Sequence, residues 1–488
     1  MFRPSLDEAK KLSSKYTVIP ISCELFSDIK TPIQVLKSIN QISSCYYLLE
    51  SVEGGEKWGR YSFLGFDPIV NVNCNNGKIV VKNGVTIEVE SDCPNTVIKN
   101  ILDEYKSPKF SYLPPFTGGF VGYIAYDYIK YSEKTLKLDL KDDVQIDDLN
   151  LMLFDKVIAF DHLKQKIIIT VNIKTDNLET NYNKAILELE KIIRIIKDVT
   201  PVYSEHSKLT SSLKAMFDKK KYCEMVSAAK QHIVDGDIFQ VVLSNRFEAN
   251  FEGSLLNTYR TLRTTNPSPY MFFLKYSNLE ITGASPETLI KLQDGELSTF
   301  PIAGTASRGK NEEQDNEFMQ TLLEDEKELS EHNMLVDLSR NDLGKISEYG
   351  SVAVKDYLKV LKFSHVMHIT STVTGKLRKG LNQLDAITAA LPAGTLSGAP
   401  KIRACEIIND LESTKRGVYG GAIGYIDFTG NMDMCIAIRM VVKKEDKVYV
   451  QVGAGIVADS VPENEYDECQ KKARAVFEAL ELSEMEID

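Results

Sequence analysis

Apolar and polar residues alternate in several short segments of the chain, which is the pattern of strands with one buried face. In the clearest case, residues 78–90 alternate on both sides of Asn83-Gly84, which predicts a β-hairpin with a two-residue turn. A second β pair is expected on either side of residues 161–166. Further strands are predicted at residues 238–247, 270–275, 279–282, 297–300 and 359–376, and residues 434–442 and 447–452 are expected to form a final hairpin.

Segments with a helical period lie between these strands. One amphipathic helix carries an apolar stripe made of Ile186, Leu189, Ile193 and Ile196. Further helices are expected at residues 219–235 and 463–481 and around Glu331.

The polar segment 201–212 is typical of a linker. We therefore expect an N-terminal region at residues 1–200 and a C-terminal region at residues 213–484. Because strands and helices alternate without a regular βαβ rhythm, the pattern favours an α+β fold over a doubly wound sheet.

Composition narrows the possible partners. The net charge of this 488-residue chain is −11, and Lys and Arg are scattered, which argues against nucleic acid and anionic membranes as partners. None of the eight cysteines forms a CxxC pair, which argues against a zinc knuckle or a thioredoxin-like motif. With no apolar signal core at the N-terminus and no run long enough to span a bilayer, a reduced, cytoplasmic setting fits best.

The segment EHNMLVDLSRND, residues 331–342, has a carboxylate on an apolar face. On a helix, Glu331 shares one face with Leu335 and Leu338, which is costly unless the carboxylate is paired or binds a metal. A second helix face carries Glu465, Glu468 and Lys472. Taken alone, that second face is more typical of solvated salt bridges. Carboxylates from two helices, with few histidines, would suit a hard ion such as Mg²⁺.

Two basic positions leave alternatives open. His365 and His368 are three residues apart, so on a strand they point to opposite faces and do not chelate one metal together; either one alone is more typical of a core histidine. Arg439 lies in the apolar segment CIAIRMVV, and a buried guanidinium needs an anion. That anion is either a structural carboxylate or an acidic ligand, and the residues alone favour neither.

Two glycine-rich segments resemble nucleotide-binding motifs without meeting their structural requirements. Gly453-Ala454-Gly455 continues to Ala458 as G-x-G-x-x-A, but Pro462 delays the next helix and the chain ends without another strand. We expect instead a glycine turn whose amides can hold a carboxylate. The segment GTLSGAPK, residues 394–401, is not a Walker A loop and predicts a turn into a helix near Pro400.

These segments together resemble the chorismate-utilising enzymes, and among them component I of the anthranilate synthases. The matching motifs are PIAGTASRG, EHNMLVDLSRNDLG, VMHITSTV, LPAGTLSGAPK, YGGAIGY, AIRM and GAGIVADSVPENEYDE, in this order over roughly the last 270 residues. LLES at residues 48–51 adds a weaker N-terminal match. The resemblance implies a four-layer α/β/β/α fold of class α+β, with two packed, mostly antiparallel sheets and the active site between them.

The resemblance also implies the residues of the site. Glu331 and Glu468 would hold Mg²⁺, and the catalytic groups would be Glu287, His368 and Glu465. Glu287, in GASPE, would be the acid that protonates the leaving hydroxyl, and its plainer alternative is a cap for the next segment. The positions that match the chorismate cradle are Gly304, Thr305, Tyr419, Arg439, Gly453, Ala454, Gly455 and Lys472.

The implied reaction is addition of ammonia at C2 of chorismate with loss of the C4 hydroxyl, followed by elimination of pyruvate to give anthranilate. Gln240 matches a position where isochorismate and salicylate synthases carry a water-activating lysine, and an amide cannot act as that base. Ala303 matches a position where aminodeoxychorismate synthases carry a nucleophilic lysine. Alanine cannot act as that nucleophile, so both positions favour anthranilate as the product. The nearest alternative is the large subunit of aminodeoxychorismate synthase, which Ala303 disfavours, and a non-catalytic amino-acid sensor is an alternative of a different class.

Regulation and a partner follow from the same resemblance. Ser51, Pro269, Tyr270 and Met271 match the site where tryptophan inhibits the family, although LLES and PYM are also typical of a strand end and of core packing. The chain shows no glutaminase nucleophile, so ammonia from glutamine would require a separate glutamine amidotransferase subunit, component II. The reaction would be the first committed step of tryptophan biosynthesis.

Overall fold

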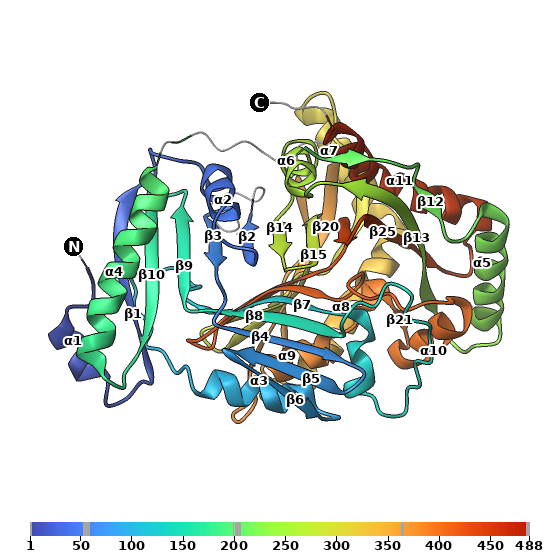
Figure 1. The fold of residues 1–488 in the computed structure, drawn as a ribbon. Helices are drawn as coiled ribbons and strands as arrows, with labels where there is room; N and C mark the ends of the chain where they lie inside the picture. Colours follow the sequence, from blue (N-terminus) through green and yellow to red (C-terminus); the bar gives the residue numbers. More distant parts are fainter. Residues whose placement is uncertain (1, 52–58, 199, 201–205, 363–365, 485–488) are drawn as a thin grey trace.

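Two large antiparallel sheets form the centre of this computed structural model, which describes residues 2–51, 59–198, 200, 206–362 and 366–484 (Figure 1). Helices cover the outer face of each sheet, so the expected four-layer α+β architecture is confirmed. Strands of the two sheets cross, and one apolar core lies between them. A second core lies between the larger sheet and its helices.

The larger sheet has 13 strands within the described residues. Their order is β1 (Val18–Phe26), β10 (Lys166–Lys174), β9 (Lys156–Asp161), β3 (Tyr61–Phe66), β2 (Tyr46–Glu50), β14 (Tyr270–Lys275), β15 (Leu279–Ser285), β24 (Met440–Lys444), β25 (Lys447–Ile456), β13 (Gln240–Glu252) and β11 (Lys208–Leu209). Two short strands, β12 (Lys214–Ala215) and β21 (Gly398–Ala399), also pair with β13.

The second sheet has 12 strands in the same described part of the chain. Their order is β18 (Ile302–Ser307), β20 (Val366–Lys376), β17 (Glu296–Thr299), β16 (Thr288–Gln293), β23 (Met432–Ile436), β22 (Ala422–Asp427), β7 (Gly119–Ile124), β8 (Leu149–Phe154), β4 (Val70–Asn75), β5 (Lys78–Asn83) and β6 (Val85–Glu90), with β19 (Ala353–Lys362) on β20. Each sheet thus contains strands from both sides of residues 201–212.

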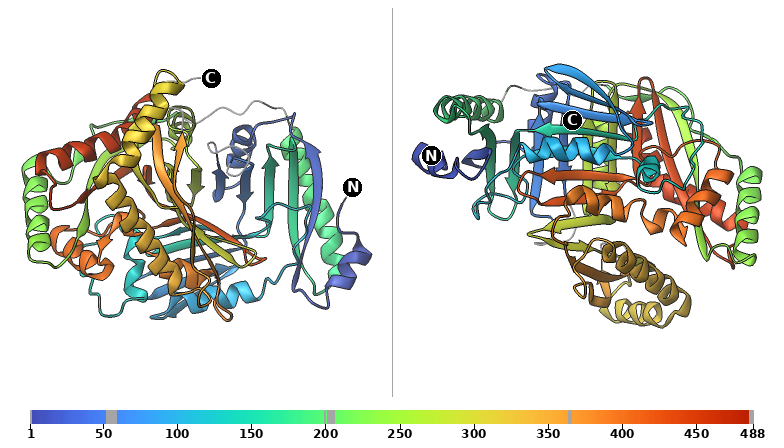
Figure 2. Two further views of the ribbon diagram at one scale, coloured as in Figure 1. Left: turned by 180° about the vertical axis from the view of Figure 1, so that it is seen from behind. Right: turned by 90° about the horizontal axis from the view of Figure 1, so that it is seen from below.

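The helices divide between the two outer faces. On the larger sheet lie α1 (Leu6–Leu12), α2 (Pro32–Asn40), α4 (Leu178–Lys197), α5 (Lys219–Val234), α6 (Leu256–Thr265), α10 (Lys401–Leu411) and α11 (Pro462–Leu482). On the second sheet lie α3 (Pro94–Asp103), α7 (Glu312–Glu324), α8 (Glu326–Gly344) and α9 (Gln383–Ala390), and Figure 2 shows α8 from behind, across the strands. Two 3-10 turns, η2 (Tyr126–Tyr131) and η3 (Gly394–Leu396), complete the elements used below.

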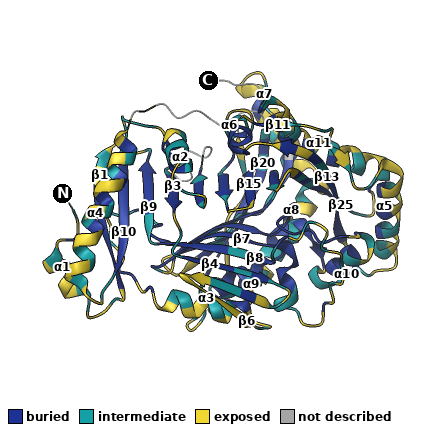
Figure 3. Cartoon of the chain, viewed as in Figure 1, coloured by how far each residue is buried: buried dark blue, intermediate teal, exposed yellow. Residues whose placement is uncertain are grey.

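Burial follows the predicted periodicities. Most strands of the two sheets are buried, whereas β6 and β19 are largely exposed and the helices expose one face to solvent (Figure 3). In α4 the buried stripe is Ala185, Leu189, Ile192 and Ile196, while Ile186 and Ile193 are only partly buried. None of the described helices is both long and apolar enough to cross a membrane. All eight cysteines are free thiols.

Most predicted elements are present, with corrections at their ends. Residues 78–90 form a hairpin, but Lys82 pairs with Thr86, so the turn is centred on Gly84 instead of lying between Asn83 and Gly84. Part of the expected linker, Lys208–Leu209, is strand β11. The single strand predicted at residues 359–376 is wrong, because β19 and β20 pair there; His365 lies outside the described residues.

The predicted final hairpin is wrong in its first strand. Residues 434–442 do not form one strand, because β23 ends at Ile436 in the second sheet and β24 begins at Met440 in the larger sheet. Only β24 pairs with β25. The chain therefore crosses from one sheet to the other at residues 437–439. A second crossing lies beside it, where β15 of the larger sheet leads into β16 of the second sheet.

Candidate active site

The two neighbouring crossings carry the two predicted residues with the most unusual environments, Glu287 and Arg439. Backbone hydrogen bonds tie the crossings together: the Ile436 amide donates to the Glu287 carbonyl, and the Ala284 amide donates to the Arg439 carbonyl, both at 3.0 Å. The Ser285 hydroxyl adds a bond of 2.7 Å to the Ile436 carbonyl. The two side chains are thus presented from one rigid seam between the sheets.

Glu287 is a carboxyl group held in a dry environment. Burial raises its pKa to about 7, and this effect is opposed by a hydrogen bond from Thr395 and by the charge of Lys472. The Thr395 hydroxyl donates to Glu287 Oε1 at 2.9 Å. The segment that follows Glu287 is strand β16. The Glu287 carboxyl group does not cap this strand but accepts a hydrogen bond from η3. Near neutral pH this carboxyl group can give up a proton.

Arg439 is a half-buried cation whose guanidinium bonds a backbone carbonyl. Its backbone is left-handed, with φ of 51°, at the point where the chain changes sheets. Its guanidinium donates to the Lys472 carbonyl at 3.3 Å, and among the described residues no carboxylate forms an ion pair with it. Burial lowers its pKa. Of the two alternatives drawn from the sequence, an acidic ligand is therefore favoured over a structural carboxylate.

The predicted glycine turn at residues 453–455 is wrong, because these residues belong to strand β25 and pair with β13. The glycines are needed for close approach. A Cβ at Gly453 would lie 2.8 Å from the Tyr419 hydroxyl, and one at Gly455 would lie 2.8 Å from Gln240 Nε2. The ladder between β25 and β24 ends at Val450, so the edge of β25 at these glycines extends beyond β24.

Lys472 of α11 reaches this strand. Its ammonium donates to the Gly453 carbonyl at 3.1 Å and forms an ion pair of 2.5 Å with Glu468, one helical turn away. The structure thus brings Tyr419, Gln240 and Lys472 around the glycines of β25, as a cradle requires. Ala454 is buried in the same strand.

The strands β18 and β20 bring together a second group of predicted residues. Gly304 has φ of 68° at a bulge in β18, and a Cβ there would lie 3.1 Å from Leu322. Its carbonyl lies 2.8 Å from His368 Nδ1, and because a carbonyl can only accept, Nδ1 carries the proton. In the neutral ring the basic nitrogen is then Nε2. Burial lowers the His368 pKa, so the ring stays neutral at pH 7. Ala303 is buried beside Gly304, and Thr305 follows in the same strand.

Helices α8 and α11 carry carboxylates that are close enough to influence one another's charge. The predicted helix is α8, so Glu331 and Leu335 lie on one helix face as expected; Leu335 is buried, whereas Glu331 is accessible to solvent. Partial desolvation and the charges of Glu328 and Glu468 raise the Glu331 pKa. Desolvation also raises the pKa of Glu465, and Glu468 adds to this increase. Within the described residues no group of three His, Cys, Asp or Glu side chains is placed to hold a metal ion.

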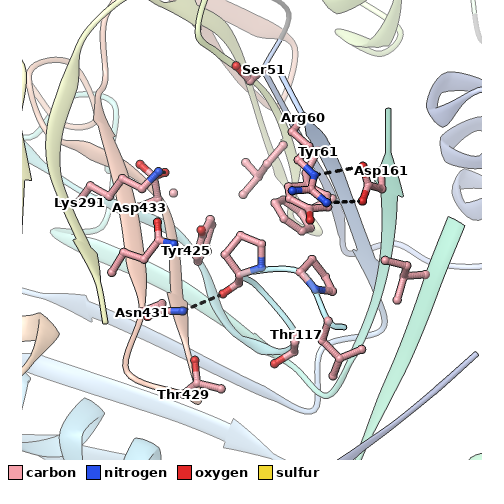
Figure 4. A pocket seen from close by; sticks show the side chains of 18 of the residues that line it. Ser51, Arg60, Tyr61, Thr117, Asp161, Lys291, Tyr425, Thr429, Asn431 and Asp433 are labelled. Carbon is pink, nitrogen blue, oxygen red and sulfur yellow. Dashed lines mark hydrogen bonds and ion pairs between the residues drawn. The ribbon is translucent and has the colours of Figure 1, made fainter. Parts of the chain in front are cut away.

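A cavity with a volume of about 880 Å³ lies elsewhere, between the two sheets. The four residues predicted for an inhibitor site, Ser51, Pro269, Tyr270 and Met271, all line it. Figure 4 shows Ser51 at one end and two ion pairs on opposite sides, Arg60 with Asp161 and Lys291 with Asp433. The Tyr270 hydroxyl donates to Asp433 at 2.9 Å.

Sequence patterns missed three kinds of residue. Thr395 lies in GTLSGAPK, which was interpreted only as a turn, so its contact with Glu287 was not expected. The pair of Arg60 and Asp161 joins residues a hundred positions apart, and no local signal connects them. Charged groups of the cavity, such as Asp433, lie in ordinary strand patterns.

Comparisons with known proteins agree with this geometry. Residues 45–478 match the family described as chorismate binding enzyme, which defines the class of protein to which the fold and the site belong. A relative from Acetivibrio thermocellus, anthranilate synthase component 1, is 46% identical over 99% of each chain.

Two solved structures share this fold, and one of them is also a close enough relative in sequence to belong to the same class. The crystal structure of anthranilate synthase component I from Streptococcus pneumoniae TIGR4 is 37% identical, with a TM-score of 0.78 over 93% of this chain and 98% of that chain. The menaquinone-specific isochorismate synthase from Escherichia coli shares the fold at 18% identity, with a TM-score of 0.72 over 98% of each chain. The chain belongs to the anthranilate synthase component 1 family of chorismate-binding enzymes.

The raised Glu287 pKa predicts a pH-dependent cost in stability. In the folded protein the carboxyl group stays protonated up to about pH 7, whereas in the unfolded chain it ionises near 4.5. Stability should therefore fall as pH rises from about 4.5 to 7, by on the order of 3 kcal/mol in total. We expect Glu287→Gln to raise the melting temperature at pH 8 and to leave it unchanged at pH 4, measured by thermal unfolding.

The control for this prediction is Glu317→Gln on the exposed face of α7, which should show no pH-dependent difference from the wild type. A Glu287→Gln variant no more stable than the wild type at pH 8 would contradict the raised pKa.

Proposed function

We propose that the chain converts chorismate and ammonia into anthranilate and pyruvate, the first committed step of tryptophan biosynthesis. The observation that carries the proposal is the seam between the sheets. It presents an acid with a pKa of about 7, Glu287, beside a half-buried guanidinium, Arg439, which has no carboxylate partner among the described residues. An anionic substrate that must lose a hydroxyl group needs both groups.

In the first step ammonia forms a bond to C2 of chorismate, the ring double bonds shift, and the C4 hydroxyl leaves. Hydroxide is a poor leaving group, so Glu287 donates its proton and the hydroxyl leaves as water. Thr395 keeps the carboxyl group in place through its hydrogen bond. Arg439, Lys472 and the amides at the edge of β25 hold the carboxylates of the substrate.

In the second step the C2 proton is removed and the ether bond at C3 breaks, which releases pyruvate and makes the ring aromatic. Two groups can accept that proton. His368 is neutral and has its basic nitrogen at Nε2 because Nδ1 is bonded to Gly304. Glu465 is the other candidate, with a pKa raised by desolvation.

Mg²⁺ would be held by Glu331 of α8 and Glu468 of α11. The donor set fits this ion, which is usually bound by one or two carboxylates together with water and anionic groups of the substrate. The negative charges of Glu328 and Glu468 act on Glu331, and a cation there would be favoured by this cluster of carboxylates. When bound, the ion would offset the negative charge of the ring carboxylate.

The choice of ammonia as nucleophile is supported by two positions. Gln240 is buried at the start of β13 and cannot act as a base toward water. Ala303 is buried in β18 and cannot attack the ring, which disfavours the aminodeoxychorismate synthase reaction. The relatives are called component 1, which implies that they act with a second component. We propose that this second component is a glutamine amidotransferase subunit that supplies the ammonia.

We also propose that L-tryptophan inhibits the enzyme from the cavity between the sheets. Ser51 and Met271 lie in its wall, and its ion pairs offer both signs of charge to an amino acid. The cavity volume of about 880 Å³ is within the range of small-molecule sites.

The proposed reaction is tested with the purified chain, chorismate, Mg²⁺ and ammonium salts. We expect formation of a fluorescent product that chromatography identifies as anthranilate, together with one equivalent of pyruvate. Aminodeoxychorismate as product would select the alternative enzyme, and no turnover at all would favour a non-catalytic sensor.

The metal site is tested by Glu331→Gln, which removes one charge and keeps the shape of the side chain. We expect a loss in kcat/KM larger than the roughly 10- to 100-fold typical of groups that only support metal ligands. The activity should also need far more Mg²⁺ for half-saturation. Glu326→Gln, at the exposed start of α8, is the control and should keep the wild-type Mg²⁺ response. Full activity of Glu331→Gln would remove this residue from the metal site.

The inhibitor site is tested by Ser51→Phe, which places a ring in the cavity. We expect the ratio of rates with and without L-tryptophan to rise to one, because the bulky side chain occupies the space of the ligand. Ser44→Phe, at an exposed position of the same segment, should keep the inhibition of the wild type. Unchanged inhibition in Ser51→Phe would place the tryptophan site elsewhere.

A further inference from the structure

Behind the proposed site lies a buried ion pair that contacts no substrate. Arg416 and Glu412 have side-chain exposures of only 1% and 4%. The guanidinium binds both carboxylate oxygens, with Nε to Oε2 at 2.8 Å and Nη2 to Oε1 at 2.6 Å. Burying such a pair is costly unless its remaining donors and acceptors are satisfied. The groups that satisfy them all belong to walls of the site.

The first wall is η3. Arg416 Nη1 donates to the carbonyl of Leu396 at 2.6 Å. The residue before Leu396 is Thr395, whose hydroxyl holds Glu287 at 2.9 Å. The guanidinium thus fixes the short turn that carries the hydrogen bond to the proposed acid.

The second wall is β13. Arg416 Nη2 donates to the Val242 carbonyl at 2.7 Å, and Glu412 Oε1 accepts from the Ser244 amide at 2.7 Å and from its hydroxyl at 3.0 Å. Val242 and Ser244 are paired across the sheet with Gly455 and Gly453. The ion pair therefore fixes β13, the strand that pairs with the glycines of β25.

The third wall is aromatic. The Arg416 guanidinium lies 4.6 Å from the centre of the Tyr126 ring and 5.9 Å from that of Tyr419. A guanidinium within about 6 Å of a ring centre attracts its face. Tyr419 is the residue whose hydroxyl approaches Gly453.

We propose that Arg416, held by Glu412, is a positioning residue of the reaction: one guanidinium aligns η3 with Glu287, β13 with β25, and Tyr419 with the substrate cradle. This inference rests on the proposed function for the roles of those walls. A lysine cannot replace it, because an ammonium ion lacks the planar fork that reaches two carbonyls and a carboxylate at once.

The test compares Arg416→Lys with the wild type in the ammonia-dependent reaction, with rates normalised to the folded fraction. We expect kcat to fall on the order of tenfold to a hundredfold, the size of the loss that a misplacement far from the chemistry produces. The KM for chorismate should change much less, because Arg439 and Lys472 remain in place. A purely structural role would lower the melting temperature and leave kcat per folded molecule unchanged, which would overturn the proposal.

A double-mutant cycle shows whether Arg416 acts through η3. If it does, adding Thr395→Val to Arg416→Lys lowers kcat little further, because the same hydrogen bond is already lost. If the two substitutions instead lower kcat by factors that multiply, Arg416 does not act through η3. The matched control is Arg246→Lys, a buried arginine farther along β13, whose guanidinium binds Asp143 at 3.0 Å and not Leu396, Val242 or Glu412. It should keep the wild-type kcat and combine multiplicatively with Thr395→Val.

Two further measurements keep the proposal testable if Arg416→Lys does not fold or if the wild-type chain does not use chorismate. If Arg416→Lys does not fold, the neutral pair Arg416→Met with Glu412→Gln fills the same space without an unpaired charge and must show the same loss in kcat. If the wild type itself does not use chorismate, the proposed function fails. A crystal structure of the Arg416 variant then decides the positioning claim, since an unmoved Thr395 hydroxyl on Glu287 would refute it.

Discussion

The site depends on two neighbouring crossings of the chain between the sheets. Because β15 pairs with β24 in one sheet and β16 pairs with β23 in the other, the two connections must run side by side through the seam. A side chain placed there is neither in a packed core nor in solvent. Glu287 is kept protonated because it is shielded from water, and Arg439 is kept charged although no carboxylate in the described part of the chain forms an ion pair with it. An acidic ligand would pair with the guanidinium of Arg439 and so reduce the cost of burying that charge. The same ligand could take the proton that Glu287 holds.

In the proposed mechanism, an acidic protein has to hold an anionic substrate. The net charge of the chain is −11, so attraction has to come from a few local groups: Arg439, Lys472 and the strand edge at Gly453. The carboxylates of α8 and α11 work against that attraction while no cation is bound, since Glu331 already experiences the charges of its acidic neighbours. In the proposed mechanism a metal ion and the substrate carboxylate each reduce the cost of binding the other. Such a coupling is reciprocal by thermodynamic necessity.

Periodicity in the sequence predicted most elements, and the errors have identifiable causes. The segment 359–376 alternates across two paired strands, so the pattern alone could not show that the chain reverses within it. Around Arg439 the residues remain apolar while the chain changes sheets, and no glycine or proline marks the change. The glycines at 453 and 455 suggested a turn, but a strand also needs glycine where Tyr419 and Gln240 approach it. Local sequence cannot show which side chains come from elsewhere in the chain.

In the candidate site, the sequence could predict only those residues whose own side chains would contact a ligand. Acids, bases and glycines in short motifs indicate such contacts, and the structure places two of them, Glu287 and Arg439, at the seam. Arg416 differs from these residues, because it donates hydrogen bonds to the backbone carbonyls of Leu396 and Val242. Any residue at those two positions would offer the same carbonyl group. Nothing in the identities of those neighbours records the contact. A positioning group of this kind becomes visible only when the hydrogen-bond partners of each buried charge are counted, which requires the fold.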